Sequence, residues 1–121
     1  MNQTAVLALL AVGAYFLLSG NLIGTGKPLF YNMSKQVITT IACGGSVIFD
    51  VTGYTNKLVW LVRMKNGVQD FAGLYTISPL PYVMNCSTDV GSYFVSVYTV
   101  NPDNSQGLLL GTTSFTVTPS S

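Results

Sequence analysis

The hydrophobic pattern of the chain changes once, near residue 35. Before that point, residues 5–23 are almost continuously apolar, without the polar stripe of an amphipathic surface helix. After it, apolar and polar positions alternate, and β-branched and aromatic residues lie between clusters of turn residues. The first pattern predicts an apolar helix and the second predicts β-strands.

Seven strands are predicted in the alternating part of the chain. Asn66-Gly67 is a tight-turn signal between the third and fourth strands, and Pro79 and Pro81 interrupt the chain before the fifth. Seven short antiparallel strands favour two packed sheets. The predicted fold class is therefore all-β, a seven-stranded sandwich preceded by one N-terminal apolar helix. The strands cover residues 36–42, 46–52, 57–65, 71–77, 82–86, 91–100 and 108–118.

Three regions follow from this pattern. Residues 1–23 form the apolar helix, residues 24–34 form a linker that contains Pro28 and Asn32, and residues 35–121 form the β domain. The 19 residues from Ala5 to Ile23 would cover about 28 Å as a helix, close to the hydrocarbon thickness of a bilayer. We expect this helix to cross a membrane or to pack in an assembly.

Small residues on the apolar helix would let a second helix approach closely. They are a GxxxG pair and an alanine edge: Ala8, Ala11, Ala14, Gly20 and Gly24. The alternative is a cleaved secretory signal, with an apolar core from Ala5 to Leu18 and small residues at 24–26. No Lys or Arg precedes the core, so we expect the segment to be retained.

Charged residues are scarce: five Lys or Arg, four Asp, no Glu and no His, for a net charge of +1. This balance offers no electrostatic surface for nucleic acid, so no nucleic-acid partner is expected. Without His or a carboxylate pair, the sequence predicts no catalytic residues, no metal site and no cofactor. We expect Lys57, Arg63 and Lys65 to lie on a solvated strand face.

The two cysteines, Cys43 and Cys86, fall in connections that lie at the same end of the predicted sandwich. We therefore expect a disulfide, with two separate buried thiols as the alternative. A disulfide would indicate an oxidising exterior or a thermophilic origin.

Two glycosylation acceptor patterns occur in the part of the chain beyond the apolar segment. They are Asn32-Met33-Ser34 and Asn85-Cys86-Ser87. Modification at Asn32 or Asn85 would place the domain outside the cytoplasm, and unmodified asparagines remain the alternative.

The segment Asp89–Val95, with the sequence DVGSYFV, resembles the D-x-G-x-Y-x-C start of the sixth strand in immunoglobulin-like domains. Phe49 precedes Trp60 by 11 residues, similar to the spacing from the second-strand cysteine to the third-strand tryptophan. Phe49 and Val95 stand at the two cysteine positions. The resemblance, over residues 35–121, implies that Tyr93 forms a tyrosine corner and that Trp60 packs between the sheets against Phe49 and Val95.

An inward Trp60 and an inward Tyr93 would leave apolar residues on the opposite strand faces. These residues would form an exposed apolar patch, which on a soluble domain indicates a protein contact. The predicted protein interface is Val59, Leu61, Phe94 and Tyr98.

In layout, the chain resembles archaeal type IV pilins and archaellins, and also minor proteins of viruses with an internal membrane. We expect a non-enzymatic structural protein, a membrane-anchored virion component that contacts the capsid. A pilin-like filament subunit and a membrane-anchored cell-surface binding or adhesion module are the alternatives. The expected partners are a lipid bilayer or copies of the same helix, and other structural proteins, in a homo- or hetero-oligomer. The expected location is a virion or a cell surface.

Overall fold

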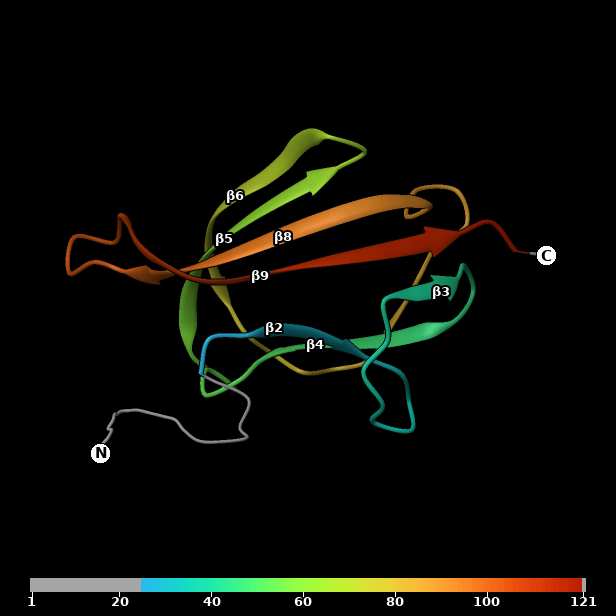
Figure 1. Ribbon diagram of the computed structural model, residues 1–121, viewed down its shortest axis with the longest axis horizontal. Helices are drawn as coiled ribbons and strands as arrows, with labels where there is room; N and C mark the ends of the chain where they lie inside the picture. Colours follow the sequence, from blue (N-terminus) through green and yellow to red (C-terminus); the bar gives the residue numbers. More distant parts are fainter. Residues whose placement is uncertain (1–24, 121) are drawn as a thin grey trace, which may run out of the picture.

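The computed structural model describes residues 25–120, which form eight β-strands in two facing sheets (Figure 1). The smaller sheet has the order β2-β4-β7 and the larger has the order β3-β9-β8-β5-β6. Neighbouring strands are antiparallel except β3 and β9, which are parallel. The strands are β2 (Pro28–Tyr31), β3 (Thr40–Ala42), β4 (Ser46–Val51), β5 (Leu58–Lys65), β6 (Val68–Thr76), β7 (Tyr82–Val83), β8 (Gly91–Val100) and β9 (Gln106–Thr118).

The predicted fold class was wrong in its strand count, because β2 lies in residues assigned to a linker. Pro28 can open this strand because the first strand position tolerates a missing N–H. The described residues contain no helix, and hence none that could cross a membrane. The predicted helix over residues 1–23 lies outside residues 25–120, as do its proposed packing positions Ala8, Ala11, Ala14, Gly20 and Gly24.

The core lies between the sheets in two clusters of buried side chains. One contains Val51, Val59, Leu61, Ile77, Val95 and Val97, and the other contains Cys43, Val47, Phe115 and Val117. Phe30 of β2 packs against both clusters. Its ring stacks on Phe115 at 4.2 Å between centroids and lies 4.9 Å from Phe49. This aromatic contact joins the two sheets.

Strand β5 turns the opposite face to the core from the one expected. Val59 and Leu61 are 0% and 6% exposed and belong to the core, whereas Trp60 is only partly buried and lies outside both clusters. Because side chains alternate along a strand, an inward Val59 places Trp60 on the outer face of the larger sheet. The expected packing of Trp60 against Phe49 and Val95 is therefore wrong. Phe49 and Tyr93 are partly buried against the core, and Val95 is fully within it.

The expected turn at Asn66-Gly67 is present between β5 and β6. Asn66 and Gly67 have φ angles of 52° and 83°, the left-handed values that a two-residue hairpin of this kind requires. The Asn66 side-chain oxygen accepts a hydrogen bond from the Ser92 N–H at 2.9 Å. The turn is thereby tied to the start of β8.

The predicted disulfide between Cys43 and Cys86 is confirmed, with the two Cα atoms 5.0 Å apart. Cys43 follows β3, and Cys86 lies after β7. Two backbone hydrogen bonds accompany the bond, from Gly44 N–H to the Met84 carbonyl and from Met84 N–H to the Gly45 carbonyl. The disulfide thus holds the short strand β7 to the turn before β4.

Replacing the cysteine pair, by Cys43→Ala with Cys86→Ala, should lower the free energy of unfolding by about 4 kcal/mol. The reason is that the bond closes a loop with a sequence separation of 43, which restricts the unfolded chain. Denaturant titration measures the loss. A reducing agent should destabilise the native protein to a similar extent and leave the variant unchanged; equal stability with and without reductant would contradict this.

The Tyr93 hydroxyl donates a hydrogen bond of 2.7 Å to the Asp89 carbonyl oxygen, as the tyrosine-corner expectation requires. Tyr93→Phe should therefore cost about 1 kcal/mol of unfolding free energy, the usual net value of such a bond. Tyr98→Phe is the control, because the Tyr98 hydroxyl has no hydrogen-bond partner within residues 25–120. Equal losses for the two variants, measured by denaturant titration, would show that the bond contributes nothing.

Candidate functional site

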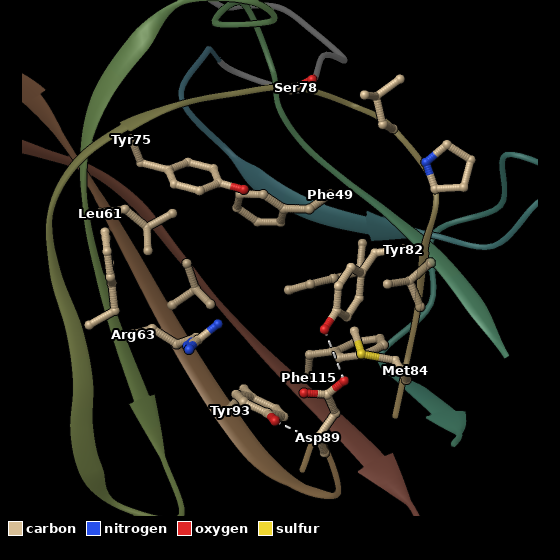
Figure 2. A pocket seen from close by; sticks show the side chains of 16 residues that line it. Phe49, Leu61, Arg63, Tyr75, Ser78, Tyr82, Met84, Asp89, Tyr93 and Phe115 are labelled. Carbon is tan, nitrogen blue, oxygen red and sulfur yellow. Dashed lines mark hydrogen bonds between the residues drawn. The ribbon is translucent and has the colours of Figure 1, made fainter. Parts of the chain in front are cut away.

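The two sheets separate along one edge and leave a cleft of about 480 Å³ between their inner faces (Figure 2). Strand β7 has only two residues, and residues 78–81 before it form no strand. The smaller sheet therefore leaves the inner side chains Phe71 and Tyr75 of β6, and Arg63 of β5, partly exposed. These three side chains line the cleft together with the buried Leu61 of β5.

Aromatic side chains dominate the cleft. Phe49 comes from β4, Phe71 and Tyr75 from β6, Tyr82 from β7 and Tyr93 from β8. Phe71 and Tyr75 are 37% and 40% exposed, and their rings meet edge to face at 6.3 Å. Large exposed rings beside a cavity are a surface that another apolar group can cover.

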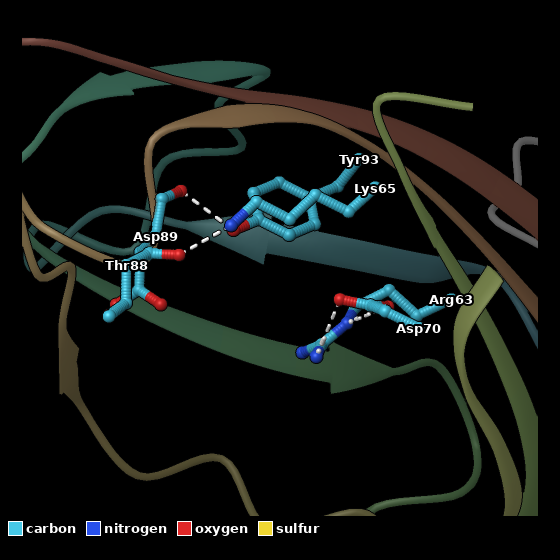
Figure 3. A network of polar contacts seen from close by, with 6 residues as sticks. All are labelled: Arg63, Lys65, Asp70, Thr88, Asp89 and Tyr93. Carbon is cyan, nitrogen blue, oxygen red and sulfur yellow. Dashed lines mark hydrogen bonds and ion pairs between the residues drawn. The ribbon is translucent and has the colours of Figure 1, made fainter. Parts of the chain in front are cut away.

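Arg63 forms an ion pair with Asp70 at the cleft side of β5 (Figure 3). Its Nε donates to Oδ1 at 2.9 Å and its second guanidinium nitrogen donates to Oδ2 at 3.1 Å. The hydrogen bond to Asp70 is the main cause that raises the pKa of Arg63 above its ordinary value. The guanidinium also lies 5.8 Å from the centre of the Tyr93 ring. Arg63 is therefore held in place by its neighbours.

The other charges near the cleft are likewise engaged. Lys65 donates to the Thr88 carbonyl and lies 5.7 Å from the Tyr93 ring centre (Figure 3). Asp89 accepts hydrogen bonds from the Asn85 N–H at 2.7 Å and from the Tyr82 hydroxyl at 3.2 Å. The negative charge of Asp89 is the largest cause that raises the pKa of Tyr82. These bonds leave a cleft whose free surface is mainly apolar.

Metal binding has no visible support in this region. Within residues 25–120, no group of three or more His, Cys, Asp or Glu side chains is placed to hold a metal ion. The residues that line the cleft provide apolar contact and a few fixed polar groups. Such a lining is suited to binding an apolar group.

A second surface is the outer face of the larger sheet. The strand register places Trp60 between Leu74 on β6 and Tyr98 on β8, and Tyr98 opposite Leu109 on β9. Four apolar side chains thus form a row across four strands. Phe94, which pairs with Met64, lies on the same face and is 43% exposed, and Leu109 is 57% exposed. We call these residues the outer-face row: Leu74, Trp60, Tyr98 and Leu109, with Phe94 beside them.

The predicted protein interface is corrected by this register. Phe94 and Tyr98 lie on the outer face, but Val59 and Leu61 are buried in the core and cannot form part of an exposed patch. Trp60 takes their place on β5. Leu74 and Leu109 were missed because only the cross-strand register brings them beside Trp60 and Tyr98.

The outer-face row also contains an unsatisfied polar atom. The Trp60 indole nitrogen is buried and has no hydrogen-bond partner within the described chain. A buried N–H without an acceptor destabilises a domain, and a water or an acceptor on a molecule that covers this face would satisfy it.

The two predicted acceptor asparagines both lie in exposed connections. Asn32 donates from its amide nitrogen to the Gln36 side chain at 3.0 Å, a bond that a glycan at this nitrogen would replace. Asn85 accepts from the Ser87 N–H at 2.7 Å and precedes the disulfide-bonded Cys86. Glycosylation at either position stays a prediction.

Comparison with protein-family models, curated proteins and solved structures finds no match to this chain. The cleft and the outer-face row therefore carry the functional inference by their own geometry.

The Tyr82–Asp89 contact predicts a pH effect. Because the folded state keeps the Tyr82 proton more tightly than the unfolded state, the contact stabilises the fold below about pH 10 and loses this effect as pH rises through the raised pKa. Asp89→Asn should lower the pKa of Tyr82 toward its ordinary value. Phenolate absorbance measures this, with Tyr82→Phe in each background isolating the Tyr82 signal. An unchanged pKa would contradict the assigned cause.

Proposed function

We propose that this protein is a non-enzymatic structural component of a virion. In this proposal its apolar N-terminal segment holds it in the particle, and the outer-face row packs against a neighbouring structural protein. The observation that carries the proposal is the aromatic and uncharged character of this face. Protein interfaces are depleted of charge at their centre and enriched in aromatic residues.

Within residues 25–120, the outer-face side chains of β5, β8 and the Trp60 side of β6 carry no charge, for a structural reason; the one nearby cation, Lys27, lies at the β9 side and donates to the Thr112 carbonyl at 3.2 Å. Arg63 and Lys65 share the inward phase of Leu61 on β5, and Asp70 on β6 is engaged by Arg63. The residues that pair with Trp60, Val62 and Met64 on both sides are all uncharged. An uncharged face can meet a protein surface without leaving an unpaired charge at the contact.

The amino-acid sequence supports anchoring, because Ala5 to Ile23 contains no charged side chain. A lipid bilayer and copies of the same chain are both partners that such a segment suits. The Cys43–Cys86 bond supports a setting outside a reducing cytoplasm, or a thermophilic origin. The resemblance in layout to minor proteins of viruses with an internal membrane supports a virion.

A filament subunit is the second candidate. It is favoured by the nine-residue strand β6, which lies at the edge of the larger sheet and, within the described residues, pairs with β5 on one side only. An open edge of this length can join copies in series.

Charge placed on the outer face should prevent incorporation. We expect Phe94→Lys with Leu109→Lys to reduce the amount of the chain in purified particles about tenfold or more, because each lysine would lose water at the contact. Mass spectrometry of the particles measures the amount, and electron microscopy shows whether they are shells or filaments.

Met33→Lys is the matched control, since Met33 is an exposed apolar residue outside the larger sheet. It should enter particles normally. Circular dichroism confirms that each variant is folded. Normal incorporation of the Phe94 and Leu109 variant would overturn the assignment of this face.

A further inference from the structure

We propose that the cleft binds the apolar segment from Ala5 to Leu18 of a second copy of this chain, as an added strand along β6 in place of the helix that the sequence pattern predicts. The inference rests on the proposed structural role, because it names the contact made by the segment that holds the protein in its particle. Three features carry it: the edge of β6, the cleft beside that edge, and the composition and position of the segment.

Between Phe71 and Thr76 the edge of β6 lacks the usual protection against strand pairing, because the bulge of this strand and its one charge, at Asp70, both precede this stretch. Exposed edge strands in soluble proteins commonly carry lysine, proline or inward-pointing charges. The sequence of β6, VQDFAGLYT, has no lysine and no proline, and its one charge belongs to Asp70, which pairs with Arg63. The regular stretch 71–76 is therefore a template for a further strand.

The surroundings of this edge define what the added strand must be. On the inner side, Phe71 and Tyr75 border the cleft, and on the outer side Leu74 is exposed. Side chains of a strand alternate between the two faces, so an added strand would meet apolar neighbours with both its odd and its even positions. The occupant therefore needs apolar residues in both phases and no charge.

The segment from Ala5 to Leu18 has this composition. Its sequence AVLALLAVGAYFLL contains no charged residue, and Tyr15 is its one side chain with a polar tip. The two longest strands of the folded domain, β8 and β9, differ because Ser, Thr or Gln stands among their apolar residues. As an extended strand, 14 residues cover about 46 Å, which exceeds the length of β6.

The position at which the segment leaves the domain favours a second copy over the same one. Residue 26 is held at the β2 side, where its N–H donates to the Thr52 carbonyl at 2.6 Å. In the smaller sheet, β2 is one edge and β7 the other, and the cleft lies at the β7 side. The N-terminal segment of one copy, which leaves at the β2 edge, can therefore reach the cleft at the β7 edge of the next copy. Repeated contacts of this kind join copies head to tail.

Photo-crosslinking in the full chain tests this directly. A benzoylphenylalanine residue replaces Tyr75 in unlabelled chain, which is assembled with a ¹⁵N-labelled chain and irradiated. The expected product joins position 75 to residues 5–18 of the labelled chain, identified by mass spectrometry. The same probe at Leu108, which is 79% exposed on β9 and does not line the cleft, should not give this product.

Charge in the segment provides a second measurement. Leu10→Asp in the labelled chain should reduce the cross-linked product about tenfold or more, because a carboxylate would enter an apolar site. Asn2→Asp, which adds the same charge outside the segment from Ala5 to Leu18, should leave the yield unchanged.

Several outcomes would overturn the inference. They are attachment to the N-terminal segment of the same copy, attachment to other residues, attachment to lipid, no attachment, or equal yields for Leu10→Asp and Asn2→Asp. The outer-face test is independent of these. If the Phe94 and Leu109 variant is lost from particles but the cross-link from position 75 does not form, only this inference is rejected. If the cross-link forms but the variant enters particles normally, only the outer-face assignment is rejected.

Discussion

The contact of Phe30 with Phe115 is the interaction on which the rest of the structure depends. Phe30 comes from the smaller sheet and Phe115 from the larger; Phe115 belongs to one core cluster, and Phe30 packs against both. This contact closes the domain along β2 and β9. The disulfide closes the end near β3 and β7. The two sheets are therefore held together at two places, by the ring contact and by the disulfide.

The remaining edge stays open because the sheets are unequal. A three-stranded sheet that ends in the two-residue β7 cannot cover a five-stranded sheet that ends in the nine-residue β6. Phe71 and Tyr75 are consequently exposed while residues at the closed edge are buried. The unequal size of the two sheets thus produces both candidate surfaces. One is the cleft between the sheets, and the other is the broad outer face of the five-stranded sheet.

Much of the fold could be predicted from local patterns. The Asn66-Gly67 turn, the long strand β8 and the Cys43–Cys86 bond depend on turn chemistry, alternation and the placement of connections, which are visible along the chain. Strand β2 could not be predicted in this way, because proline and glycine near it indicate a linker. Its identity as a strand depends on pairing with β4 and on burial of Phe30.

The sequence by itself determined that charged residues are few, and it predicted an all-β domain whose two cysteines lie at one end. Tertiary structure alone decided which face of β5 is buried. Both phases of this strand are apolar near Trp60, and the charges of Arg63 and Lys65 favoured the prediction that their phase faces solvent. They can lie in the inner phase because the cleft is open there, and because Asp70 and the Thr88 carbonyl, which lie beyond β5, accept their hydrogen bonds. Period-two alternation gives two equivalent choices of face, and only long-range partners distinguish them.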